Sequence, residues 1–278
     1  MAARTRNKLG NNDSLQMDFE PAPHLNEGSI VDYELKTALS LQASMAQVLK
    51  KLKKKTSEDN VHKSRVALRR WFSVWSVMQE QGWNSDEFAR KQIKPLRRLL
   101  KAMGALRDLD VCMGKAKALG CSDSLLKKLK RQRKKRERIL TQLIDDVEPL
   151  GITDKIEIYL QKQAASLSAE GKATPFQVFN QYICTQEENV RKIALKAATP
   201  EDLHKTRLAI KKWRYLLTEC LGLTNLTLVT AQTTLGELHD LDRLELILRE
   251  NQESAEVLKA LRLARADLFK QWMRCRDR

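Results

Sequence analysis

Residues 61–71 read VHKSRVALRRW, and residues 203–213 read LHKTRLAIKKW. Five of the eleven positions are identical in the two segments, namely His, Lys, Arg, Ala and Trp, and the other six are conservative exchanges. A segment of this length does not recur so closely by chance, so the two copies indicate an internal duplication.

Each copy has the periodicity of an amphipathic helix, with an apolar stripe beside a basic face. The apolar stripe consists of Val61, Leu68, Trp71, Phe72 and Trp75 in the first copy, and of Leu203, Ile210, Trp213 and Leu217 in the second. The basic residues recur at i, i+3 and i+7, which places them above one another on one side of the helix. Because like charges one turn apart repel, we expect an anion to bind over this face.

The basic faces supply the candidate phosphate-binding residues. From the first copy and the helix after it these are His62, Lys63, Arg65, Arg69, Arg70, Arg97, Arg98 and Lys101, and from the second they are His204, Lys205, Arg207, Lys211, Lys212 and Arg214. The planar fork of a guanidinium group can donate two parallel hydrogen bonds to phosphate oxygens. The copies differ at i+10, where Phe72 stands in the first and Arg214 in the second, so the halves are expected to contribute unequally.

The chain is strongly basic, with 51 Lys and Arg against 35 Asp and Glu and a formal net charge of +16. Residues 50–138 hold 27 basic and 9 acidic residues and carry most of the excess. A field of this strength predicts a polyanionic partner such as polyphosphate, nucleic acid or an anionic membrane surface. Residues 127–138 have nine cations in twelve positions and form either a solvated helix face or an extension of the anion track.

A second element also occurs twice, as GALRDLD in residues 104–110 and GELHDLD in residues 236–242, each time after the motif helix. Residues 1–29 are polar, and we expect them to be disordered; no later segment alternates like a strand. We therefore predict an all-α fold of two pseudo-symmetric helical bundles around a basic central groove or channel. The predicted halves are residues 30–150 and 151–278.

Helices are expected at residues 30–56, 59–81, 86–103, 104–119, 122–148, 152–169, 175–198, 201–221, 226–238, 239–252 and 254–275. Thr199 is the expected N-cap of the second motif helix, with Pro200 in its first position.

No run of about 20 apolar residues and no signal peptide is recognised. The five scattered cysteines are expected to be buried, reduced thiols of a cytosolic protein.

The four aspartates of the second element invite a metal or acid–base interpretation. We instead expect Asp108, Asp110, Asp240 and Asp242 to cap helices or to pair with motif arginines. Two carboxylates separated by one residue on a helix point to different faces. No Walker loop, zinc-ligand spacing or catalytic triad is present, so the sequence predicts neither a catalytic site nor a metal or cofactor.

These residues resemble the conserved histidine α-helical domain, the CHAD family. The resemblance rests on His62-x-x-Arg65-x-x-x-Arg69, His204-x-x-Arg207-x-x-x-Lys211, Arg214-Tyr215 and the two Gly-x-Leu-x-Asp-Leu-Asp elements. It implies two pseudo-symmetric bundles, binding of inorganic polyphosphate and, in some members, association with polyphosphate granules. The alternating glutamates of the triphosphate-tunnel domain, to which this family is often fused, are not recognised here.

The predicted function is therefore non-enzymatic binding of inorganic polyphosphate in the cytoplasm, where association with polyphosphate granules is an expectation from the resemblance. The first alternative is an RNA- or DNA-binding protein, although aromatic residues make up only 5% of the chain and the motif tryptophans fall on the apolar stripe. The second alternative is a hydrolase of polyphosphate or phosphate esters. The oligomeric state does not follow from the sequence.

Overall fold

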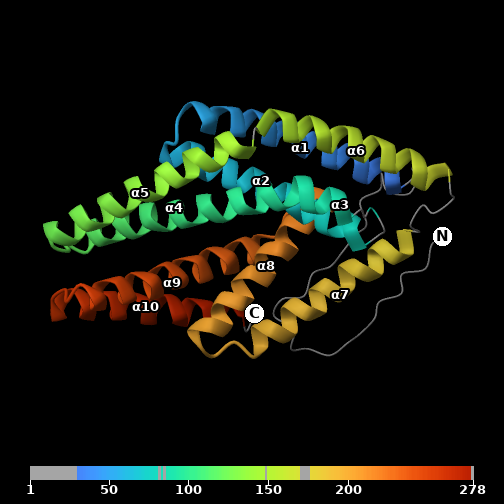
Figure 1. Cartoon of the computed structure of the whole chain (residues 1–278). Coiled ribbons are helices and arrows are strands. Elements are labelled where there is room, and N and C mark those ends of the chain that lie inside the picture. Colours follow the sequence, from blue (N-terminus) through green and yellow to red (C-terminus); the bar gives the residue numbers. More distant parts are fainter. Residues whose placement is uncertain (1–29, 81–82, 84–85, 148, 170–175, 277–278) are drawn as a thin grey trace, which may run out of the picture.

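The computed structural model describes residues 30–80, 83, 86–147, 149–169 and 176–276 (Figure 1). Every regular element in these residues is helical, so the predicted all-α class is confirmed. The predicted disordered segment, residues 1–29, lies outside the described residues. No helix in the described ranges combines the length and the apolar character that crossing a bilayer requires.

The helices follow the predicted order with small differences at their ends. They are α1 (Ile30–Lys54), α2 (Glu58–Glu80), α3 (Asp86–Phe88), a π-helical turn (Ala89–Ile93), α4 (Lys94–Ala118), α5 (Asp123–Val147), α6 (Pro149–Ala169), α7 (Phe176–Leu195), α8 (Pro200–Leu221), α9 (Leu226–Glu250) and α10 (Ala255–Arg276). Two motif helices, α2 and α8, therefore contain the two copies of the duplicated segment.

Two predicted breaks are wrong, because α4 continues through Gly104 and α9 continues through residues 238 and 239. A glycine inside a helix costs only about 1 kcal/mol relative to alanine, and the buried faces of α4 and α9 offset that cost. The irregular part of the first segment lies earlier, in the π-helical turn before Pro95. Pro95 occupies the first turn of α4, where its missing N–H is harmless.

The start of α8 was predicted correctly. Thr199 is its N-cap, and the hydroxyl of Thr199 accepts a hydrogen bond from the backbone N–H of Asp202 at 3.2 Å. The carboxylate of Asp202 accepts from the backbone N–H of Thr199 at 3.3 Å, which completes a capping box with Pro200 in the first turn. These bonds fix the position at which the second basic face begins.

The helices pack as hairpins, with α1 on α2, α4 on α5, α8 on α9 and α9 on α10. The motif helices α2 and α8 also contact each other, and the α4–α5 and α9–α10 hairpins extend side by side in Figure 1. Helix α6 packs mainly along α1, although it follows the predicted divide near residue 150. The contact between α2 and α8 brings together segments about 140 residues apart.

Buried side chains form two apolar cores. The larger core surrounds the motif helices and buries Trp71, Trp75 and Trp213, whose side chains are at most 2% exposed, as the apolar stripe predicted. The smaller core joins the two long hairpins through residues such as Cys112 of α4 and Leu244 of α9. Cys112, Cys121 and Cys220 are buried thiols, as predicted; Cys184 is exposed and Cys275 is only partly buried, so the prediction of burial is wrong for these two.

The expected capping role of the repeated aspartates is wrong, because these residues lie inside continuous helices. Asp110 of α4 accepts a hydrogen bond from Arg133 of α5 at 2.6 Å, and Asp242 of α9 accepts one from Arg265 of α10 at 2.5 Å. Both pairs join residues 23 positions apart, so the same ion pair connects the two helices of each long hairpin. Neither partner is an arginine of the motif helices.

The two hairpin ion pairs should differ in their effect on stability. The Asp110 side chain is 2% exposed and that of Asp242 is 20% exposed. Replacing Arg133 by Ala leaves a buried carboxylate unpaired, so we expect a loss of about 3 kcal/mol in the free energy of unfolding. Arg265→Ala, at the more exposed pair, is the matched control and should cost about 1 kcal/mol. Chemical denaturation of both variants measures the difference, and equal losses would contradict this ranking.

Candidate functional site

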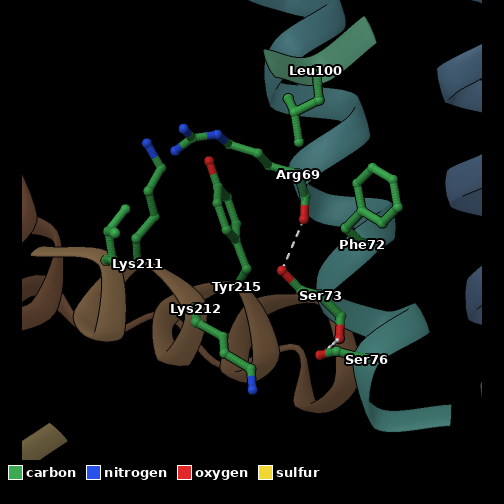
Figure 2. Close-up of a pocket in the computed structure, with 9 residues that line it drawn as sticks. Arg69, Phe72, Ser73, Ser76, Leu100, Lys211, Lys212 and Tyr215 are labelled. Carbon is green, nitrogen blue, oxygen red and sulfur yellow. Dashed lines mark hydrogen bonds between the residues drawn. The ribbon is translucent and has the colours of Figure 1, made fainter. Parts of the chain in front are cut away.

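Four motif cations meet where α2 and α8 cross. Arg65 and Arg69 of α2 lie close enough to Arg207 of α8 for its charge to lower the pKa of both guanidinium groups. Arg69, Arg207 and Arg65 in turn lower the pKa of Lys211. Figure 2 shows the guanidinium group of Arg69 and the ammonium group of Lys211 converging beside the hydroxyl of Tyr215. We call Arg65, Arg69, Arg207 and Lys211 the central cation cluster.

The repeated glycines make room for the arginines of this cluster. A Cβ atom on Gly104 of α4 would lie 3.6 Å from Nε of Arg65, and one on Gly236 of α9 would lie 3.6 Å from Nε of Arg207. Each motif arginine therefore passes across the backbone of the helix that carries the second repeated element. The two repeated elements of the sequence are thus in contact in each half: the arginine of the motif helix lies beside the glycine of the second element.

The central cation cluster is poorly neutralised. Burial, followed by repulsion from Arg69, Arg207 and Arg65, lowers the pKa of Lys211 to about 6. Burial, followed by repulsion from Arg65, also lowers the pKa of Arg69 to about 10. Within the described part of the chain, no ion pair joins a cluster residue to a carboxylate, and Nε of Arg65 is buried without a hydrogen-bond partner. These cations therefore favour an added anion.

The motif histidines lie at the edges of the cluster. The pKa of His62 is lowered by burial and then by the charges of Arg107, Arg65 and Lys211. The pKa of His204 is lowered by burial and then by Arg207 and Arg243. Both imidazoles are therefore neutral near pH 7, and each can donate one hydrogen bond to an anion.

His239 is a neighbour of the site that was not among the residues predicted from the sequence. Its ring centroid lies 4.3 Å from that of His204, and burial with repulsion from Arg207 lowers its pKa to about 4. The alignment of the repeats contained the signal, because His239 corresponds to Arg107, which lies near His62. The residue at this repeated position therefore contacts the motif histidine in one half and acts on it through its charge in the other.

Asp108 is a carboxylate whose charge acts on the arginines of the cluster. Its charge raises the pKa of Arg65 and Arg69, but its carboxylate accepts a hydrogen bond from Arg243 of α9. Asp240 is partly buried, and burial raises its pKa. Among the described residues, no group of three or more His, Cys, Asp or Glu side chains is arranged to hold a metal ion.

Three predicted site residues have carboxylate partners of their own. Lys63 pairs with Asp59 at 2.7 Å and Lys205 pairs with Glu201 at 3.0 Å, each one helical turn away and exposed. Arg70 donates two hydrogen bonds to Glu219 of α8, at 2.6 and 2.9 Å. The side chain of Glu219 is 6% exposed, so this pair connects the motif helices and is part of the fold.

The remaining predicted residues lie around the cluster. Arg97, Arg98 and Lys101 are exposed on α4, and the guanidinium group of Arg97 lies 5.4 Å from the ring centre of Phe72. Arg214 donates to the side-chain oxygen of Gln232 at 2.8 Å and lies over the ring of Tyr215. Lys212 is exposed, and in Figure 2 it points away from Arg69 and Lys211. The structure therefore brings together only part of the predicted set.

One pocket opens directly beside the cluster and is shown in Figure 2. It has a volume of about 320 Å³ and lies between α2, α8 and α4. Its lining residues are Arg69, Phe72, Ser73, Ser76, Leu100, Leu208, Lys211, Lys212 and Tyr215. The pocket is thus cationic at one edge and apolar along most of its wall.

The fold and the site define a class of all-helical proteins in which unneutralised cations lie between two repeated helices. Residues 38–249 match the CHAD domain, and the chain belongs to the CHAD domain family. A comparison with curated proteins finds no match.

Two solved structures share the fold. One is the CHAD domain from the plant Ricinus communis, with a TM-score of 0.66, 18% identity, and coverage of 92% of this chain and 90% of that chain. The other is PptA from Streptomyces chartreusis, with a TM-score of 0.65, 14% identity, and coverage of 92% and 97%. At these identities the likeness shows the architecture and nothing about the ligand.

The close packing of Arg65 against Gly104 can be tested with two substitutions at residue 104. A Cβ at 3.6 Å is in ordinary van der Waals contact, so Gly104→Ala should fit and should stabilise α4 by about 0.5–1 kcal/mol through its higher helix propensity. Gly104→Leu is larger and should displace the guanidinium group of Arg65. We expect thermal unfolding to show a higher Tm for the alanine variant, and anion binding to weaken only in the leucine variant. Equal binding by both variants would contradict the role assigned to Gly104.

Proposed function

We propose that this protein binds inorganic polyphosphate through the central cation cluster, without catalysing a reaction. The observation that carries this proposal is the gathering of four partly buried cations, Arg65, Arg69, Arg207 and Lys211, without an ion-pair partner among the carboxylates in the described part of the chain. Such an arrangement is unfavourable when empty. A bound phosphate chain neutralises several cations at once, with bidentate hydrogen bonds from the guanidinium groups.

The proposed mechanism is electrostatic. α2 and α8 contain the two copies of the motif, and their cations meet in the central cation cluster where the helices cross. In this proposal a linear chain of phosphates lies over the cluster, with the neutral imidazoles of His62 and His204 at its edges. Release of the counterions condensed on the chain contributes to the free energy of binding, as it does for nucleic acids. In this proposal the protein acts in the cytoplasm, where polyphosphate granules supply the ligand.

Nucleic acid is the second candidate polyanion, favoured by the exposed basic run of α5. Single-strand binders combine a basic groove with aromatic platforms on which bases stack. Trp71, Trp75 and Trp213 are buried in the larger core and offer no row of platforms for the successive bases of a strand. A chain of phosphates needs no such row, and the cluster therefore supports polyphosphate better than a nucleic-acid strand.

Charge reversal in the cluster tests the proposal. Arg65→Glu combined with Arg207→Glu removes two attractions and adds two repulsions, and each lost charge-assisted hydrogen bond is worth about 1.5–3 kcal/mol. We expect the affinity for one defined length of polyphosphate to fall at least about a hundredfold. Titration across a salt series should also show a shallower dependence of log K on log salt, because fewer counterions are released.

The matched control reverses two exposed arginines of α5, Arg131→Glu and Arg138→Glu. The net charge changes by the same amount, but solvent and salt screen these positions, so the loss should be much smaller. Circular dichroism establishes that both double variants are folded. If the control loses as much affinity as the cluster variant, binding is spread over the basic surface and the cluster is not the site.

Proton uptake is a separate signature of the cluster. With its pKa lowered to about 6, Lys211 is neutral at pH 8 in the free protein. A polyanion over the cluster raises that pKa towards its ordinary value, so binding at pH 8 should take up about one proton. As the pH falls below about 6, Lys211 is already protonated and this uptake should disappear. Calorimetry in two buffers of different ionisation enthalpy measures it, and Lys211→Met should abolish it at pH 8; uptake unchanged in this variant would assign the proton elsewhere.

A further inference from the structure

The surroundings of the cluster differ in chemistry between the two halves, although the helices that form them are repeated. Phe72 corresponds to Arg214 in the motif alignment, and Leu100 corresponds to Gln232 in the alignment of the second element. In the second half, Arg214 and Gln232 are hydrogen bonded to each other at 2.8 Å. In the first half the same two positions are apolar and line the pocket beside the cluster.

The pocket is lined by one face of each motif helix. Residues 69, 72, 73 and 76 of α2 and residues 208, 211, 212 and 215 of α8 have the same spacing of i, i+3, i+4 and i+7. Leu208 is 45% exposed, which leaves a large apolar side chain facing the open space. The hydroxyls of Ser73 and Ser76 donate to carbonyls of their own helix, so they contribute little free polarity to this wall.

Inorganic polyphosphate does not account for this apolar end. The chain has the same chemistry at both ends and contains no apolar atom, so neither Phe72 nor Leu208 can gain from contact with it. A groove made for inorganic polyphosphate alone has no use for an apolar wall of this size at one end. The asymmetry instead fits a ligand whose phosphate chain carries one uncharged, flat end group.

We infer that the site accepts nucleoside polyphosphates, with the base against the apolar wall and the phosphate chain running over Arg69 and Lys211 into the central cation cluster. The inference rests on the proposed anion-binding function and specifies its ligand class. The volume of about 320 Å³ lies within the usual range of small-molecule sites, about 300–1,000 Å³. Arg69 and Lys211 border both the pocket and the cluster, so the two parts of the ligand meet at these residues.

The test compares ATP with inorganic tripolyphosphate at equal ionic strength and without divalent cations. Both ligands have three phosphate groups, and tripolyphosphate has the larger negative charge because both of its terminal phosphates are free. Tighter binding of ATP must therefore come from the nucleoside. We expect ATP to bind at least about fivefold more tightly, since contact of a base with a protein side chain contributes on the scale of base stacking. Isothermal titration calorimetry on the full chain gives both dissociation constants.

Leu208→Asn places a polar group on the apolar wall and should remove the advantage of ATP while leaving tripolyphosphate binding unchanged. Because Leu208 is already 45% exposed, this substitution should not affect folding. Leu263→Asn on α10, where the leucine is 61% exposed and does not line the pocket, is the matched control and should leave both ligands unaffected.

The outcomes separate this inference from the proposed function. If long-chain polyphosphate binds but ATP and tripolyphosphate have equal affinity, the nucleoside inference is overturned and the proposed function stands. If Leu208→Asn weakens both ligands equally, the apolar wall has no specific role and the inference also fails. If no phosphate chain of any length binds, the proposed function itself is wrong.

Discussion

Mutual repulsion among the four cations at the α2–α8 crossing is the constraint on which the rest of the structure depends. Nothing within the described cluster neutralises Arg69 or Lys211, so their positions must be held by other parts of the molecule. The buried tryptophans on the opposite faces of α2 and α8 supply that support through apolar packing, and the bidentate pair between Arg70 and Glu219 adds a direct connection. Packing therefore holds the cations close together against their mutual repulsion, and in the proposed function a bound anion relieves that repulsion.

The helical architecture could be predicted well because its signals are local and strong. The apolar stripes, the capping box at Thr199 and the scarcity of strand patterns each gave the correct element. The errors came from residues with two common roles. Gly104 was interpreted as a helix break, whereas it lies inside α4, where the side chain of Arg65 passes close to it. A single sequence does not show that tertiary contact.

The candidate site could be predicted only in part. Spacing on one helix shows which cations share a face, and it correctly grouped Arg65 with Arg69 and Arg207 with Lys211. It does not show which cation meets a carboxylate from a distant segment, so the pairing of Arg70 with Glu219, 149 residues away, was not foreseen. The contact between the rings of His204 and His239 was missed for the same reason, and so was the pair of Asp110 with Arg133.

The smaller apolar core between the long hairpins has a mechanical consequence. The halves touch at α2 and α8 and again at α4 and α9, where Cys112 and Leu244 share that core. Two separate contact regions between the halves resist the hinge motion that a single contact region would allow. The distance between α2 and α8 is then set by the fold, so in the proposed function little conformational entropy is lost when a phosphate chain binds. Rigidity of this kind places no limit on the length of that chain.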